Sequence, residues 1–308
     1  MKVVVTGATG FVGSRLVERL QTEGHTVKVL TRNSIRGRRV FPADAFPNVE
    51  VTSYSPLESG DWQQTIAGCD GVVNLAGEPI AESRWTPGRK QAILNSRTIG
   101  AQKIVEAIAK ADPKPEVLVN ASAIGYYGTS ETATFDETSS PVAADFLSQV
   151  CQAWEAEAQK VEKTGVRLVI LRVGIVLGKG GAIARMQLPF QLYAGGPIGS
   201  GRQWFSWIHR EDLVSLILKA LTDPKLQGRF NATTPNPVRM NELCKALGEA
   251  MNRPSWLPVP DFVIETLLGD GAQVVLKGQK VLPKRTQTIG FQYQYPKIAE
   301  ALKEILSP

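Results

Sequence analysis

The chain has 308 residues, of which 43% are hydrophobic and 21% are charged, and this balance excludes both a wholly disordered chain and a fibrous protein. Its length suits about two domains, or one α/β unit with an appendage. The formal charge of +6 comes from 35 Lys and Arg against 29 Asp and Glu, dispersed along the chain; it favours anionic ligands weakly and leaves nucleic-acid binding a minority interpretation.

The amino-terminal part of the chain predicts a complete strand–turn–helix–strand unit. Residues 2–6 form a short β-branched run that ends in glycine, which is typical of a buried parallel strand. Residues 11–23 carry apolar side chains at helical spacing, and residues 26–31 predict a second strand.

Apolar strands and amphipathic helices then alternate along the chain. Strands are predicted at residues 71–75, 117–121 and 168–171, and the clearest helices at residues 90–110 and 146–163. Strands that alternate with long helices indicate a parallel sheet covered by helices on both faces. We therefore expect an α/β fold with a doubly wound parallel sheet.

The alternation loosens beyond this sheet, and the change predicts the domain organisation. We expect a first domain at residues 1–178, with sheet elements recurring at 202–235, and a substrate or cap region at 179–308. A smaller, mixed carboxy-terminal cap is expected at about residues 253–308, where several prolines precede helices predicted at residues 262–268 and 298–306.

Three glycines lie in the turn between the first strand and the first helix, in the pattern G-x-x-G-x-x-G. Gly7 permits a tight turn, Gly10 lets the backbone approach a pyrophosphate, and Gly13 allows close packing of helix on strand. Free N–H groups at the start of the helix can hold the anion. A turn without a ligand is the alternative, but the position and context favour a dinucleotide site in a Rossmann-type fold.

The end of the second strand selects between the two nicotinamide dinucleotides. An NAD site needs a carboxylate there, whereas this chain has Thr31 and Arg32 there, and the first acidic residue after the second strand is Asp44. Arg32 can pair with a 2′-phosphate and stack on adenine, and Thr31 can add a hydroxyl. We therefore expect NADP(H); the alternative is a solvated basic loop at residues 32–39 that could contact RNA.

With these features in place, the chain resembles the extended short-chain dehydrogenase/reductase superfamily over nearly its whole length. Asn-Leu-Ala-Gly at 74–77, Asn-Ala-Ser-Ala at 120–123 and Leu-Arg-Val-Gly-Ile-Val-Leu-Gly at 171–178 are similar to its cofactor and serine segments. The resemblance is closest to an atypical subgroup labelled epimerase-family or cell-division-inhibitor-like proteins, which carry a carboxy-terminal cap. The segments that support it are 95–97, 125–128, 207–209 and 278–283.

The turn, the second strand and this resemblance together assign the cofactor-binding residues. They are Gly7, Thr9, Gly10, Phe11, Val12, Gly13, Thr31, Arg32, Leu75, Ala76, Arg97 and Val176. For Arg97, which lies within the helix predicted at 90–110, a structural ion pair is the alternative to a cofactor contact.

The sequence departs from the superfamily at its catalytic pair. Those enzymes use Tyr-x-x-x-Lys on a helix, so that the ammonium and the cofactor ribose lower the pKa of the tyrosine for proton transfer. Aligning the helix through Trp-Glu at 154–155 puts Leu147 at the tyrosine position and Cys151 at the lysine position, and Arg97 replaces the active-site asparagine. Leucine cannot exchange a proton, so standard short-chain dehydrogenase chemistry is not expected.

Two polar residues remain as catalytic candidates. Ser122 could donate to a substrate carbonyl or could simply cap the following turn. Tyr126 could replace the missing acid, although such tyrosines are more often core aromatics with one satisfied hydroxyl.

Four further residues are candidates for the substrate pocket. Glu78, Arg84 and Trp85 follow the 74–77 segment and could form a wall or a lid, with a loop salt bridge as the alternative. His209 suits proton transfer by its pKa, but it could instead pack the substrate lobe before a helix capped by Asp212. No metal site is expected, because the acidic residues and histidines show no metal-ligand spacing.

Two functions remain open at this point. One is an NADP(H)-dependent oxidoreductase or epimerase of nonstandard mechanism acting on a small molecule. The other is a noncatalytic regulator or scaffold that binds NADP(H). Such a regulator would act in cell or plastid division and would have a protein partner. We expect a cytoplasmic protein, because no apolar run reaches the ~18 residues of a membrane helix, no signal peptide precedes the first strand, and the three separated cysteines fit a reducing compartment.

Overall fold

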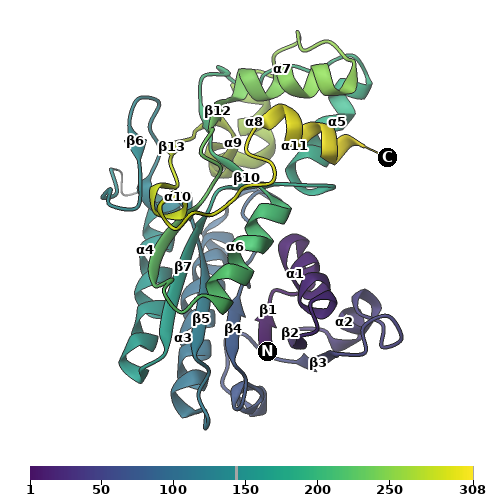
Figure 1. The fold of residues 1–308 in the computed structure, drawn as a ribbon. Helices are drawn as coiled ribbons and strands as arrows, with labels where there is room; N and C mark the ends of the chain where they lie inside the picture. The colour runs from purple at the N-terminus through teal and green to yellow at the C-terminus, as the bar shows by residue number, and fades with distance from the viewer. Residues whose placement is uncertain (143–144, 308) are drawn as a thin grey trace.

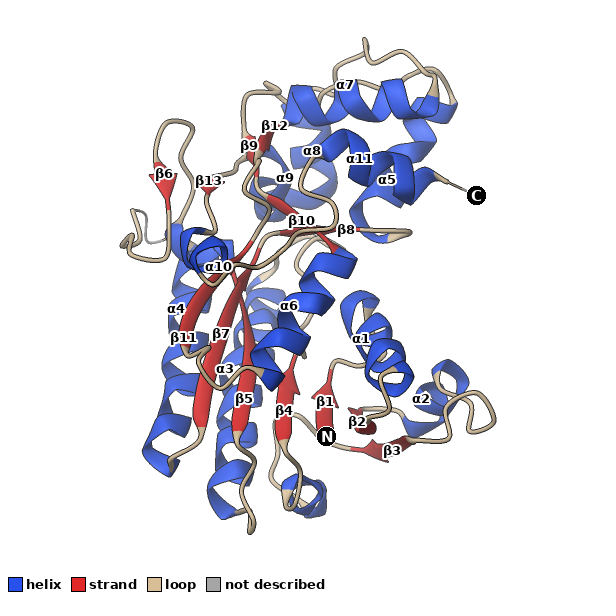
Figure 2. Cartoon of the chain, viewed as in Figure 1, coloured by secondary structure: helices blue, strands red, loops and turns tan. Residues whose placement is uncertain are grey.

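The computed structural model describes residues 1–142 and 145–307, and its centre is a seven-stranded parallel sheet (Figures 1 and 2). The strand order is β3-β2-β1-β4-β5-β7-β11. The strands are β1 (Lys2–Thr6), β2 (Thr26–Thr31), β3 (Val49–Ser53), β4 (Gly71–Asn74), β5 (Val117–Ala123), β7 (Arg167–Val173) and β11 (Gly228–Ala232). The expected α/β class with a doubly wound parallel sheet is confirmed.

Both faces of the sheet are buried, which explains why its strands are apolar throughout. Alternate strand residues pack against α1 (Phe11–Thr22) and α6 (Arg210–Thr222) on one face. The intervening residues pack on the other face against α3 (Pro87–Lys110), α4 (Phe146–Gln159) and the 3-10 helix η3 (Lys160–Thr164). Full burial of each such side chain contributes about 1.5–3 kcal/mol, so this two-sided core is the main source of stability.

The sheet reverses its strand order between β1 and β4, which pair directly in parallel. β2 and β3 extend the sheet on one side, while β5, β7 and β11 extend it on the other. In open α/β sheets ligands bind at the carboxyl ends of the strands at such a switch point. The glycine turn after β1 lies there.

The carboxy-terminal region forms a second lobe above the sheet (Figure 1). Its core joins α5 (Gly181–Gln191), α7 (Met240–Met251) and α11 (Ile298–Leu306), and α7 and α11 lie side by side. The other elements here are short: α8 (Asp261–Leu268), η4 (Gly269–Ala272), α9 (Gln273–Leu276), α10 (Lys284–Thr288) and the strand pairs β8 (Ile175–Leu177)–β10 (Trp207–His209), β9 (Trp204–Phe205)–β12 (Val238–Arg239) and β6 (Thr134–Phe135)–β13 (Lys280–Val281).

Two details of the alternative interpretations are wrong. The segment given as an alternative basic loop is mostly helical, since α2 (Ser34–Val40) begins where the Asn33 side chain accepts the backbone N–H of Arg36. Asp212 does not cap α6: His209 is the capping residue, and the Asp212 carboxylate accepts backbone N–H groups of the carboxy-terminal segment instead.

The other main helices and strands lie within a few residues of their expected bounds, except β3, α5, α6, α7 and β11, for which the sequence patterns gave no bounds. Among the described residues, no helix is both long and apolar enough to cross a membrane.

Candidate functional site

The glycine turn leaves no room for side chains at two of its positions. Gly7 has a φ of +67°, and a Cβ there would lie 2.7 Å from the carbonyl carbon and oxygen of Leu75. A Cβ at Gly13 would lie 2.3 Å from the carbonyl oxygen of Gly7. Because real Cβ atoms do not approach backbone so closely, both positions require glycine and the turn can sit flush against the end of β4.

Helix α1 begins at this turn with its amide groups free. Gly10 is the N-cap, no side chain caps the helix, and its first turn contains no acidic residue. The N–H groups of a first helical turn have no partner within the helix, and the helix dipole favours an anion beside them. The turn therefore fits a pyrophosphate held by the backbone of residues 11–13.

Arg32 extends from the end of β2 into solvent, with 70% of its side chain exposed. Its Nη1 lies 2.7 Å from Oε1 of Glu78, and Nη1 of Arg89 lies 2.9 Å from Oε2 of the same carboxylate. Two guanidinium groups thus converge on one anion beside the glycine turn. Thr31 is buried, and its hydroxyl accepts the backbone N–H of Asn33 at 3.4 Å.

Arg97 supports the backbone at the end of β4. Its Nη1 donates to the carbonyl oxygens of Glu78 at 3.0 Å and Ile93 at 3.2 Å, and a Cβ at Gly77 would lie 3.1 Å from its Cζ. Burial lowers the pKa of the Arg97 guanidinium. The structure thus places Arg97 behind residues 77–78, and its contact with a cofactor stays a prediction.

A chain of buried polar side chains, which the sequence analysis missed, links the ends of three strands. The Thr6 hydroxyl donates to Oδ1 of Asn74 at 2.6 Å, and Nδ2 of Asn74 donates to Oδ1 of Asn120 at 2.7 Å. Buried polar groups that are fully paired fix one arrangement of the backbone around them. Polar residues at the ends of apolar strands were the available signal.

Ser122 belongs to a second buried network. Its hydroxyl donates to Oε1 of Glu155 at 2.7 Å, and Nε and Nη2 of Arg172 each lie 2.8 Å from that carboxylate. Burial would lower the pKa of Arg172, but the bonds to Glu155 raise it above its usual value. Glu155 and Arg172 were not identified from the sequence. Ser122 is therefore held by an ion pair, and its catalytic role stays a prediction.

The two neighbouring tyrosines have different environments. The hydroxyl of Tyr127 donates to Asn231 at 2.8 Å and accepts from Arg172, and burial raises the pKa of Tyr127 to about 12. Tyr126 is half-buried, with its ring centroid 3.4 Å from Cζ of Arg172. Within the described part of the chain, the Tyr126 hydroxyl makes no hydrogen bond. Of the two phenols, Tyr126 is the one free to meet a ligand.

Leu147 and Cys151 lie one turn apart on α4. A Cβ at Gly125 would lie 3.4 Å from Cβ of Leu147 and 3.7 Å from Sγ of Cys151, so both side chains face the segment that follows β5. Burial raises the pKa of the Cys151 thiol to about 12. The pair therefore presents an apolar group and a neutral thiol.

Two of the four pocket candidates, Arg84 and Trp85, lie beside the second lobe, while Glu78 is paired with Arg32 and Arg89. Glu78 begins the loop, Trp85 packs against Gly271, whose Cβ would lie 3.1 Å from Nε1 of Trp85, and Arg84 lies beside Gly269. Trp85 is buried, with its Nε1 donating to the carbonyl oxygen of Ile80. This loop forms a wall against η4, and contact with a substrate stays a prediction.

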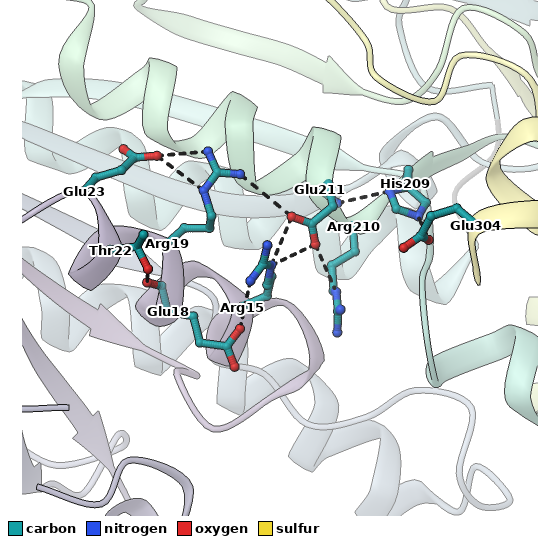
Figure 3. A network of polar contacts seen from close by, with 9 residues as sticks. All are labelled: Arg15, Glu18, Arg19, Thr22, Glu23, His209, Arg210, Glu211 and Glu304. Carbon is teal, nitrogen blue, oxygen red and sulfur yellow. Dashed lines mark hydrogen bonds and ion pairs between the residues drawn. The ribbon is translucent and has the colours of Figure 1, made fainter. Parts of the chain in front are cut away.

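His209 lies apart from that loop, in the network drawn in Figure 3. Its Nδ1 accepts the backbone N–H of Glu211 at 3.3 Å, and its Nε2 lies 3.1 Å from Oε2 of Glu304 on α11. The Glu211 carboxylate meanwhile accepts from Nε of Arg15 at 2.9 and 3.0 Å, which joins α6 to α1. His209 thus connects α6 to the carboxy-terminal helix.

The remaining residues were predicted to contact the cofactor, and that contact stays a prediction. Val176 lies on β8 and is half-buried. Thr9, Phe11 and Val12 lie in the turn and the first turn of α1, and Ala76 follows β4. Over residues 1–142 and 145–307, no group of three or more His, Cys, Asp or Glu side chains is arranged to hold a metal ion.

The glycine turn and the unpaired N–H groups at the start of α1 lie together at the switch point of a parallel sheet. This combination defines a Rossmann-type dinucleotide-binding protein. The sequence profile described as "NAD dependent epimerase/dehydratase family" matches residues 3–232, and the chain belongs to that family. A second profile, "Domain of unknown function (DUF1731)", matches residues 259–305.

Two relatives align with nearly the whole chain. The Epimerase family protein SDR39U1 homolog, chloroplastic, of Arabidopsis thaliana is 50% identical, over 99% of this chain and 87% of that protein. Epimerase family protein YfhF of Bacillus subtilis (strain 168) is 39% identical, over 100% of this chain and 98% of that protein. Both names carry the epimerase label, and neither supports the cell-division-inhibitor label.

Solved structures show the same architecture. The crystal structure of human epimerase family protein SDR39U1 (isoform 2) with NADPH matches with a TM-score of 0.85 and 36% identity, over 99% of each chain. UDP-glucuronic acid 4-epimerase from Bacillus cereus, in complex with UDP-glucuronic acid and NAD, matches with a TM-score of 0.81 at 16% identity, over 99% of this chain and 98% of that one. The latter shares the fold.

Proposed function

We propose that this protein binds NADP(H) and acts on a small molecule as an oxidoreductase or epimerase without the usual Tyr-x-x-x-Lys pair. The observation that carries the proposal is the convergence of Arg32 and Arg89 beside a turn that only glycine fits. A 2′-phosphate is the dianion that two guanidinium groups suit. The human relative crystallised with NADPH supports the same assignment.

Different parts of the chain bind different parts of this cofactor. The backbone of residues 11–13 holds the pyrophosphate, Arg32 meets the 2′-phosphate, and the backbone at Leu75 and Ala76 lines the opposite side of the turn. When bound, the nicotinamide supplies or accepts hydride. Arg97 keeps residues 77–78 in place under the cofactor, since it bonds the carbonyl of Glu78.

Tyr126 is the residue to which we assign proton transfer. Its phenol has no hydrogen-bond partner among the described residues, while its ring rests on the Arg172 guanidinium. That guanidinium is fixed by Glu155, so the ring has a defined position. A positioned phenol can exchange a proton with a substrate oxygen. Ser122 is the weaker assignment, because its proton is already donated to Glu155.

A noncatalytic NADP(H)-binding regulator or scaffold in cell or plastid division is the second candidate. One observation favours it: Leu147 and a protonated, buried Cys151 occupy the positions of the catalytic pair. For either function we propose a cytoplasmic location, although the Arabidopsis relative is named chloroplastic.

Titration of the purified protein with NADPH and NADH tests the cofactor. We expect NADPH to bind more tightly, and Gly10→Val to abolish both because its side chain would block the approach of the pyrophosphate to the backbone, besides placing a Cβ 3.1 Å from the carbonyl oxygen of Gly7. Gly88→Val is the matched control, since its Cβ would meet nothing within 4 Å. No uptake of either nucleotide by a folded wild type would overturn the proposal.

Turnover separates the two functions. Substrate-dependent oxidation of NADPH across a metabolite panel, lost in Tyr126→Phe but kept in the wild type, supports the enzyme. Tight NADPH binding with no turnover on any substrate, and equal nucleotide affinity of wild type and Tyr126→Phe, supports the regulator.

A further inference from the structure

Arg210 is a cation whose guanidinium has no hydrogen-bond partner in the described residues. It is the first residue of α6, and only 22% of its side chain is exposed. Its Nε is buried and unpaired, and the nearest carboxylate oxygen, on Glu211, lies 3.8 Å away. Because that Nε is closed to solvent, a ligand can meet Arg210 only through the 22% of its side chain that is exposed.

Of the three arginines in this cluster, Arg210 is the one without a close carboxylate partner among the described residues. Glu211 is the carboxylate shared by this cluster, and both of its oxygens accept from Nε of Arg15. Arg19 also approaches Glu211, at 3.8 Å, and bonds Glu23 at 2.9 Å. Arg15 also pairs with Glu18 at 3.1 Å, so Arg15 and Arg19 have close carboxylate partners, whereas Arg210 has only the 3.8 Å contact with Glu211.

The side chain of Arg210 lies against the start of α1. Its Cζ is 5.0 Å from the ring centroid of Phe11, the first residue of that helix. A Cβ at Gly178 would lie 3.1 Å from both Cβ of Arg210 and Cζ of Phe11, so Gly178 lets the two side chains pack there. In Figure 3 the α1 side chains run from Glu23 through Arg19 to Arg15, and Arg210 lies beyond Arg15, at the amino-terminal end.

We propose that Arg210 binds the pyrophosphate of the cofactor, together with the backbone N–H groups of residues 11–13. The glycine turn itself offers amide dipoles but no full charge, whereas a pyrophosphate diester is a dianion. A guanidinium held over the first residue of α1 supplies the missing cation, and its stacking on Phe11 keeps it pre-positioned. This inference rests on the proposed NADP(H) binding.

The test compares two ligands that share the 2′-phosphate. NADPH carries the pyrophosphate, while 2′-AMP lacks it. Arg210→Gln should weaken NADPH about ten- to a hundred-fold, as for loss of a hydrogen bond to a charged group, and should leave 2′-AMP unchanged. Arg32→Gln should weaken both. Arg19→Gln is the matched control, because it removes a neighbouring arginine from the same cluster without touching the start of α1, and it should bind as the wild type does.

The outcomes separate this inference from the cofactor assignment. Equal NADPH affinity of Arg210→Gln and wild type overturns the role of Arg210 and leaves NADP(H) binding intact. Equal weakening of NADPH and 2′-AMP also overturns it, because the effect is then structural. Failure of the wild type to bind NADPH overturns the proposed function first. If Arg210→Gln unfolds, Arg210→Lys keeps the charge without the planar fork and should give a smaller NADPH-specific loss.

Discussion

Arg32 and Glu78 form an ion pair of 2.7 Å that joins the end of β2 to the segment after β4. Burial would raise the pKa of the Glu78 carboxyl, but the hydrogen bonds from Arg32 and Arg89 hold it below its usual value. The carboxylate therefore stays charged between two guanidinium groups. A cofactor phosphate that arrives at Arg32 must compete with it.

Arg32→Glu should weaken NADPH about ten- to a hundred-fold and NADH far less, because it replaces a phosphate partner by a repelling charge. Isothermal titration with both nucleotides measures the difference. Arg36→Glu makes the same charge change on an exposed residue of α2 and should affect NADPH only slightly. Equal losses for the two nucleotides would show that Arg32 is not the selector.

Glu78→Gln should tighten NADPH by up to about five-fold, because it releases Arg32 from a partly exposed pair that is worth at most ~1 kcal/mol. The affinity for NADH should change less. Glu82→Gln is the control, since the one ion pair of Glu82 within residues 1–142 and 145–307 is with exposed Arg185 at 3.5 Å. Weaker NADPH binding by Glu78→Gln would mean that Glu78 positions Arg32 for the phosphate instead of competing with it.

The fold was predictable because its signals are local. The β-branched run at residues 2–6 and the apolar spacing in α1 define a strand and a helix without knowledge of the rest of the chain. β3 was missed because it is an edge strand whose residues are mostly half-exposed or exposed, and α2 because its arginines read as a basic loop.

The site could be predicted only where the local backbone conformation defines it. Parts of the site that depend on hydrogen bonds or ion pairs between distant side chains could not be predicted. The glycine turn was found from spacing, and the structure shows why two of its positions must be glycine. The bond from Ser122 to Glu155 and the ion pair of Glu155 with Arg172 join separate elements, and such long-range pairs leave no periodic pattern. Arg210 was not identified for the same reason, because its neighbour Phe11 lies far away from it in the sequence.

Glu155→Ala should lower the free energy of unfolding by about 3–5 kcal/mol, because it leaves the Arg172 guanidinium buried without its counter-ion. Denaturant unfolding measures this loss. Glu157→Ala on the same helix removes a carboxylate that pairs with exposed Lys160 and should cost less than about 1 kcal/mol. A stable Glu155→Ala variant would show that Arg172 finds another partner.

The thiols should be inert in the folded protein. Burial raises the pKa of Cys151 and of Cys244 to about 12, and it also raises the pKa of Cys69. Since the thiolate is the reactive form, iodoacetamide should label none of the three in the native state and all of them in denaturant, as counted by mass spectrometry. Rapid native labelling of Cys151 would instead indicate an activated cysteine at the position of the missing lysine.

His209 should make stability depend on pH. Its Nδ1 accepts an N–H, so the neutral ring carries its proton on Nε2 and donates it to Glu304. Burial lowers the pKa of His209 below its usual 6.5, despite the attraction of Glu304. The unfolded chain therefore takes up this proton first as the pH falls, so the stabilisation is complete above about pH 6.5 and is lost as the pH falls towards the folded-state pKa.

His209→Asn tests this, because asparagine keeps an N-cap acceptor for α6 and cannot titrate. Burial raises the pKa of nearby Asp212, which acts in the opposite sense, so the informative quantity is the difference in unfolding free energy between wild type and variant at each pH. We expect the advantage of the wild type over His209→Asn to shrink steadily from about pH 7 to about pH 5. An advantage that grows over this range would mean that His209 takes up its proton more readily in the folded state, with Glu304 as its counter-ion, and a constant advantage would mean that folding does not shift its pKa.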